Sequence, residues 1–231
     1  MKQLNKEELF IDDKKIVVFK KDNPEVLLLQ PVDERELEEV NKIAEGIFSE
    51  SPINIIYVAY VIGDWNKELS PWYAPAVFGK YDFKGEGKRT LNFISGTLIP
   101  EIKNRYLLND NIKKIIGGYS LAGLFSLWAV YQTDMFDSVV AASPSVWFEK
   151  FLDYTKKNLI RTRNIYLSLG DREEYTKNKM MSSVGDCIRE LYAMYKDNQS
   201  ISSCTLEWNK GNHFVDSDKR IISGYNWTLN R

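Results

Sequence analysis

The 231-residue sequence is long enough for one large domain or two small ones, and its 44% hydrophobic and 27% charged residues are typical of a folded globular protein. Its 31 lysines and arginines nearly balance its 32 aspartates and glutamates, so no net field favours nucleic acid or an anionic membrane. The longest apolar run, residues 53–63, is too short for a bilayer-spanning helix of about 20 residues.

Short β-rich runs alternate with longer amphipathic runs along the chain. Strands are predicted at residues 15–20, 25–32, 54–62, 112–119, 138–144, 164–170 and 204–208. Helices are predicted at residues 34–48, 88–106, 121–132, 148–158, 178–195 and 215–229. Gly96 and Pro100 are expected to bend the second helix, and a long loop that contains Trp65 precedes it. This alternation predicts a single domain, residues 1–231, with a mostly parallel sheet covered by helices on both faces.

The cysteine and histidine content limits the chemistry and the compartment. Cys187 and Cys204 form neither a disulfide framework nor a C-x-x-C pair, and the first fifteen residues are too polar for a signal or transit peptide. We therefore expect a reducing, cytoplasmic location. His213 is the only histidine, which excludes zinc sites built on several histidines, and neither a metal nor another cofactor is expected.

Ser120 lies between a predicted strand and a predicted helix, in the stretch GGYSLAG. As a helix N-cap alone, it would accept a hydrogen bond from a backbone N–H two or three residues later. A nucleophile on a sharp strand-to-helix turn also needs small residues two before and two after it, and Gly118 and Ala122 occupy these positions. We favour the nucleophile, although alanine departs from strict G-x-S-x-G, and we expect the Leu121 N–H to face the group attacked.

His213 is the candidate base for Ser120. It lies in GNHF, between the last predicted strand and the last predicted helix. A lone histidine is more often a surface or capping residue, but this one follows a strand at the sheet edge where Ser120 is expected, and ligands bind at that edge. The acid of a triad would follow the strand 164–170. The candidates there are Asp171, Glu173 and Glu174, and spacing alone does not choose among them.

Four motifs, GGYSLAGLFSLWA, SPSVWF, LSLGDREE and GNHF, occur in this order and together resemble the Putative esterase family of α/β-hydrolases. That family includes esterase D-like enzymes, trilactone siderophore esterases, feruloyl esterases and mycolyltransferases. The resemblance runs from about Glu25 to Phe214, with short stretches between the motifs that leave no room for a separate lid domain. It implies an α/β-hydrolase fold and a serine carboxylesterase that acts on a small to medium ester.

The resemblance also implies roles for individual residues. Ser120 matches the family's nucleophile and His213 its general base. The family's acid often follows the glycine that ends its strand by three residues. Counted from Gly170, that position is Glu173, with Asp171 as the second choice.

The oxyanion hole of the family needs a second backbone donor just after an earlier strand, in addition to the Leu121 N–H. In the stretch LLLQPVDE this donor corresponds to the N–H of Val32, because Pro31 has no N–H. Asp33 is the fallback.

Tryptophans on the predicted loops are candidates for the pocket rim. Trp65 and Trp147, together with Trp72, would suit an aryl, acyl or sugar-like group. The alternative is that some of these tryptophans pack into the core.

The expected partner is a small-molecule ester, with no nucleic acid and no membrane, and the oligomeric state is open. Two other functions remain. The same triad could transfer the acyl group to an alcohol, or the fold could serve as a non-catalytic binding protein.

Overall fold

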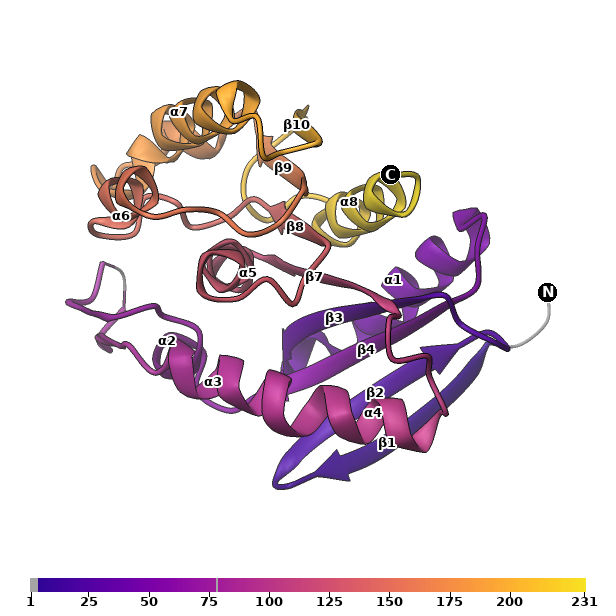
Figure 1. Ribbon diagram of the computed structural model, residues 1–231. Helices are drawn as coiled ribbons and strands as arrows, with labels where there is room; N and C mark the ends of the chain where they lie inside the picture. Colours follow the sequence, from indigo (N-terminus) through magenta and orange to yellow (C-terminus); the bar gives the residue numbers. More distant parts are fainter. Residues whose placement is uncertain (1–3, 78) are drawn as a thin grey trace.

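An eight-stranded sheet forms the centre of the computed structural model, which describes residues 4–77 and 79–231 (Figure 1). The strand order is β1-β2-β4-β3-β7-β8-β9-β10. The strands are β1 (Asn5–Ile11), β2 (Lys14–Lys20), β3 (Val26–Asp33), β4 (Ile55–Ile62), β7 (Lys113–Tyr119), β8 (Ser138–Ala142), β9 (Asn164–Gly170) and β10 (Ser203–Asn209). From β4 to β10 all neighbours are parallel, which confirms the mostly parallel sheet predicted from the sequence.

The sequence did not predict the outermost strand, β1. It pairs antiparallel with β2 from Asn5↔Lys20 to Ile11↔Lys14, and the tight turn between them places Asp12 in the left-handed region, with φ 52°. β1 begins with four polar residues, and only its last three residues are apolar. Such charged residues suit an edge strand, because they oppose pairing with another chain. The strand forms because β2 supplies its hydrogen-bonding partner.

Helices cover both faces of the sheet, as predicted (Figure 1). α1 (Leu37–Glu50) and α8 (Ser217–Leu229) pack on one face. The other face carries α3 (Gly87–Phe93), α4 (Ile99–Arg105), α5 (Leu121–Gln132), α6 (Phe151–Lys157) and α7 (Val184–Asp197). The segment predicted as a long loop contains the short α2 (Trp65–Glu68) and a two-stranded ribbon of β5 (Tyr73–Ala74) and β6 (Phe83–Lys84). None of the described helices is long and apolar enough to cross a membrane.

The helix predicted at residues 88–106 is continuous but not uniform. A π-helical segment, Ile94–Leu98, joins α3 to α4 and contains Gly96. Pro100 lies in the first turn of α4, where the missing N–H matters least.

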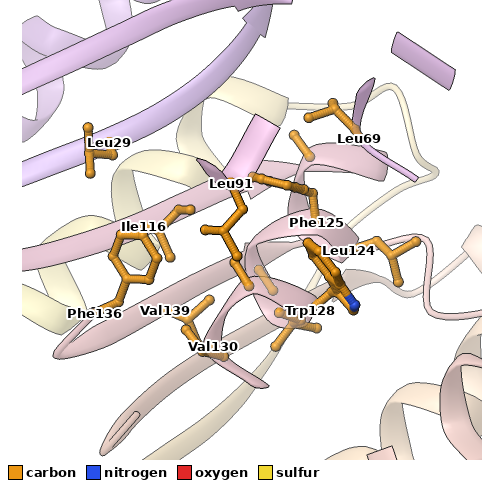
Figure 2. Packing of buried hydrophobic residues seen from close by; sticks show 14 of the residues in the cluster. Leu29, Leu69, Leu91, Ile116, Leu124, Phe125, Trp128, Val130, Phe136 and Val139 are labelled. Carbon is orange, nitrogen blue, oxygen red and sulfur yellow. The ribbon is translucent and has the colours of Figure 1, made fainter. Parts of the chain in front are cut away.

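α5 is the central helix of the core. Every residue from Leu121 to Tyr131 is buried, so this helix is apolar all round rather than amphipathic. Figure 2 shows Leu124, Phe125 and Trp128 of α5 packed in one cluster with residues from the sheet and from α3, namely Leu29, Ile116, Val139 and Leu91. Packing on all sides fixes the start of α5 beside the end of β7.

α8 lies unusually close to the sheet because two glycines make room for it. A Cβ on Gly224 of α8 would lie 2.3 Å from Cγ1 of Val140, and a Cβ on Gly117 of β7 would lie 2.7 Å from the hydroxyl oxygen of Tyr225. Neither contact is possible for a real side chain. This approach brings the first turn of α8 to the carboxyl ends of β7, β8 and β9.

Candidate active site

A sharp turn joins β7 to α5. Ser120 is the single residue between them and has φ 57° and ψ −121°, a strained conformation for serine. A Cβ on Gly118 would lie 2.5 Å from the carbonyl carbon of Ala122 and 2.7 Å from its Cβ. Only glycine therefore fits at 118, and only a small residue at 122. The turn forms although alanine replaces the last glycine of the G-x-S-x-G pattern.

The hydroxyl of Ser120 does not cap α5. The residue occupies the N-cap position, but its side chain makes no capping hydrogen bond. Its Oγ instead lies 3.0 Å from Nε2 of His213 and 3.4 Å from Oγ of Ser145. The Ser120 carbonyl accepts a hydrogen bond from the Ser145 N–H at 3.0 Å, which ties the turn to the loop after β8.

The three acidic residues after β9 point to three different partners. Glu173 Oε2 lies 2.6 Å from Nδ1 of His213. Asp171 accepts a hydrogen bond from the Gly211 N–H at 2.8 Å, and Glu174 pairs with Arg189 of α7 at 2.9 Å. Of these three acids, only Glu173 contacts the imidazole in the structure.

The other oxygen of Glu173 is held by three donors. Oε1 accepts hydrogen bonds from the Ser143 hydroxyl, the Gly170 N–H and the guanidinium of Arg220, each at 2.7 Å. Glu173 is 8% exposed, and burial alone would raise its pKa. The pKa is nevertheless lowered, because the hydrogen bond and charge of His213 and the donors Ser143 and Gly170 favour the carboxylate.

His213 lies on the loop between β10 and α8. The Tyr119 hydroxyl donates a hydrogen bond to the His213 carbonyl at 2.7 Å, and the two rings are 5.1 Å apart. The side chain of His213 is 28% exposed, and Phe214 beside it is 88% exposed. The loop that carries His213 is therefore anchored by Tyr119, while part of the imidazole remains exposed.

Sequence reasoning missed three residues of this cluster, namely Tyr119, Ser143 and Arg220. A signal existed for Arg220. It falls on the same face of α8 as Ile221, Gly224 and Tyr225, all of them buried. An arginine on the buried face of a helix requires an acidic partner, and that requirement could have directed attention to Glu173.

The two backbone donors predicted for an oxyanion hole lie in different elements. Leu121 is the first residue of α5, where N–H groups have no partner within the helix. Val32 is in β3, which pairs with β7 only from Val26 to Leu29 and then continues beside β4 alone. The N–H of Asp33, the fallback donor, is already hydrogen-bonded to the Glu36 carboxylate at 3.0 Å.

Two of the tryptophans pack behind side chains that line a cavity, and Ser120, His213 and Glu173 are not among its lining residues. The cavity has a volume of about 230 Å³ and is lined by residues 74–77, Phe83, Phe148, Glu149, Asn178 and Met180. Trp147 is 8% exposed and packs edge-on against Phe83, with ring centroids 6.3 Å apart. Trp72 packs on Phe148, and Trp65 is half-buried against the core. Trp147 and Trp72 thus lie behind two aromatic side chains that line the cavity.

The sequence matches the family described as Putative esterase over residues 36–198, more than half of the chain. No curated protein matches it by sequence. Among solved structures, an IroE-like serine hydrolase from Shewanella oneidensis superposes with a TM-score of 0.81 at 13% identity, covering 99% of this chain and 80% of that one. The siderophore hydrolase EstB from Aspergillus nidulans gives 0.75 at 18% identity, covering 99% and 95%. The enterobactin esterase FES from Shigella flexneri gives 0.69 at 16% identity, covering 98% and 59%.

The structural similarity, at these identities, shows the fold, which is that of the α/β-hydrolases. The family match covers four of the eight strands of the sheet, the serine turn and the acidic loop. The chain therefore belongs to the Putative esterase family of α/β-hydrolases and is a carboxylic ester hydrolase.

Proposed function

We propose that the protein cleaves a small to medium carboxylic ester through an acyl-enzyme, with Ser120 as nucleophile, His213 as general base and Glu173 as the triad acid. One observation carries this proposal. The chain of contacts is unbroken, at 3.0 Å from Ser120 Oγ to His213 Nε2 and at 2.6 Å from His213 Nδ1 to Glu173 Oε2. These are the separations that proton transfer and tautomer control require.

In the first half-reaction, His213 Nε2 takes the proton of the Ser120 hydroxyl while Oγ attacks the ester carbonyl. The negative charge that develops on the carbonyl oxygen is stabilised by the N–H groups of Leu121 and Val32. Glu173 keeps the proton of the neutral imidazole on Nδ1 and stabilises the imidazolium that forms. The imidazolium then gives its new proton to the leaving alcohol, and an acyl-serine remains.

In the second half-reaction, a water molecule replaces the alcohol. His213 takes a proton from this water, the hydroxide attacks the acyl carbonyl, and the proton returns to Ser120 as the acid leaves. The partly exposed imidazole favours this step, because water can reach it directly. Hydrolysis is therefore the proposed outcome rather than transfer to a second alcohol.

The small to medium size of the substrate is inferred from the resemblance to the family, since Ser120, His213 and Glu173 are not among the residues that line the cavity of about 230 Å³. Trp147 and Trp65 would bound this region, Trp147 by supporting the ring of Phe83. The similar structures include a siderophore hydrolase and an enterobactin esterase, which fits an ester substrate for this chain as well.

The test is hydrolysis of short p-nitrophenyl esters together with labelling by a fluorophosphonate probe. We expect Ser120→Ala and His213→Ala each to lose hydrolysis by at least about 10⁴-fold. Mass spectrometry should find the probe on Ser120. Ser145→Ala is the matched control, because its hydroxyl lies 3.4 Å from that of Ser120, and this variant should still be labelled. Hydrolysis that survives Ser120→Ala, or a folded protein that the probe does not label, would reject the proposal in favour of a binding protein.

A further inference from the structure

Arg220 is among the largest fully buried side chains of the described residues, at 2% exposed. It lies in the first turn of α8. Its Nη1 is 2.7 Å from Glu173 Oε1, 2.7 Å from Ser143 Oγ and 3.1 Å from the Tyr119 hydroxyl. Its Nη2 donates to the Asn212 carbonyl at 3.0 Å. One guanidinium thus contacts the ends of β7 and β8, the acid after β9 and the residue before His213.

The local backbone is shaped to admit this guanidinium. A Cβ on Gly170, the last residue of β9, would lie 2.4 Å from the Gly211 carbonyl oxygen, 2.9 Å from Nη2 of Arg220 and 3.0 Å from Oε1 of Glu173. Any other residue at this position would therefore push the pair apart. The Nε of Arg220 has no hydrogen-bond partner among the described residues, so the side chain makes its bonds at the Nη atoms, toward the site.

The two oxygens of Glu173 have different tasks. Oε1 is bound by Arg220, Ser143 and the Gly170 N–H, whereas Oε2 is left for His213. A buried carboxylate without a counter-ion holds a proton more tightly, either on itself or on a hydrogen-bonded base. A guanidinium stays charged throughout the working range of an enzyme and therefore opposes that proton at all such pH values.

We propose that Arg220 is a positioning residue of the triad, which fixes Oε1 of Glu173 and offsets its charge so that Oε2 meets a neutral imidazole in the resting enzyme. Arg220 acts through Glu173 and the Asn212 carbonyl. This proposal rests on the function proposed above.

Two tyrosines near the pair stay neutral where the enzyme would work. Burial raises the pKa of Tyr119, on β7, to about 12. Burial also raises the pKa of Tyr166, on β9, whose hydroxyl donates to Glu207 of β10. The remaining charged groups nearby are Asp171, bound to the Gly211 N–H, and the exposed pair of Asp216 and Lys219 on α8. All of these are the same in the variants below.

The chain offers a direct measurement, because His213 is its only histidine. Its imidazole proton signals can therefore be assigned in an NMR spectrum without further labelling and followed through a pH titration. We expect the titration midpoint to rise by about one pH unit or more in Arg220→Met, because removing a neighbouring positive charge strengthens proton binding by the Glu173–His213 pair. The acidic limb of the kcat/KM profile should move in the same direction. Arg220→Lys, which keeps the charge, should leave the midpoint near that of the wild type.

The rate constants distinguish two roles of Arg220, namely the anchoring of Glu173 by hydrogen bonds and the supply of a positive charge beside it. An ammonium cannot bond Glu173 and the Asn212 carbonyl as a planar guanidinium does, so we expect kcat to fall about tenfold or more in Arg220→Lys, with KM little changed. A folded Arg220→Met with the wild-type midpoint would overturn the proposal. Where Arg220→Met does not fold, Arg220→Lys still decides it, because a raised midpoint or a wild-type kcat in this variant contradicts the proposal. Failure of the wild type to label at Ser120 would instead reject the proposed function and leave the titration valid.

Discussion

Two carboxylates near opposite edges of the sheet are each held between two basic side chains. On the outer strand β1, Glu8 pairs with Lys6 at 2.8 Å and with Lys15 at 2.9 Å. Beyond β9, Glu173 pairs with His213 at 2.6 Å and with Arg220 at 2.7 Å. Both carboxyl groups have a lowered pKa. That of Glu8 falls to about 2, chiefly through the hydrogen bonds from Lys6 and then Lys15.

The two carboxylates differ in what surrounds them. The side chain of Glu8 is 44% exposed, so water and salt screen its pairs and can replace either lysine. The side chain of Glu173 is 5% exposed, and no solvent can replace a lost donor there. The direction of a pKa shift therefore does not identify a functional acid. Burial among partners from several elements does.

The largest expected effect is the loss of activity when Glu173, the buried carboxylate, is replaced. Glu173→Gln should lower kcat/KM by about 10³- to 10⁴-fold, because the amide can neither fix the tautomer of His213 nor stabilise the imidazolium. Glu174→Gln is the matched control, since the neighbouring carboxylate binds Arg189 instead. It should stay within about threefold of the wild type, as should Asp171→Asn. Steady-state hydrolysis of a p-nitrophenyl ester measures all three, and a loss confined to Asp171→Asn would move the triad acid to that residue.

A smaller effect concerns stability in acid. The pKa of Glu173 in the folded protein lies below the ordinary value of 4.5, so its ionised form stabilises the fold above that pH. This contribution is lost as the pH falls through the folded pKa. The free energy of unfolding in urea should therefore decrease more between about pH 7 and about pH 3.5 in the wild type than in Glu173→Gln. An equal decrease in both proteins would mean that Glu173 is not stabilised as a carboxylate.

The smallest effect is expected when Glu8, the exposed carboxylate, is replaced. Glu8→Gln should change the free energy of unfolding by less than about 0.5 kcal/mol and leave hydrolysis unchanged, because exposed ion pairs contribute little. Any small loss should disappear in about 1 M salt, which screens charges at the surface. Denaturant unfolding at low and high salt measures this, and a large loss that resists salt would show that the two regions are not as different as proposed.

The sequence predicts the parallel strands and long helices well because their periodicity is local. Buried strands such as β4 and β7 are apolar on both faces, and α5 is apolar all round, so each can be found without knowing its neighbours. β1 cannot be found in this way. Its first residues are polar, and its strand conformation depends on pairing with β2.

The same distinction applies to the site. Ser120 and His213 can be identified from their local turns and from the order of the motifs, although 93 residues separate them. The choice of Glu173 over Asp171 and Glu174 rested on a resemblance, because side-chain directions in a short loop depend on the folded backbone. The place of Arg220 depends on how α8 rotates and how closely it lies on the sheet. The helical pattern of α8 indicates that Arg220 is on the buried face, but it does not indicate how closely the helix lies on the sheet.

The position of Arg220 in α8 also bears on the order in which a nascent chain becomes an enzyme. A ribosome makes Glu173 47 residues before the arginine that contacts it, and β7 to β9 can begin to fold before α8 has emerged. Among the described residues, no other arginine and no lysine pairs with this carboxylate. Assembly of the site then coincides with the docking of a late segment, and the first turnover of ester by a newly made molecule would mark the end of its folding.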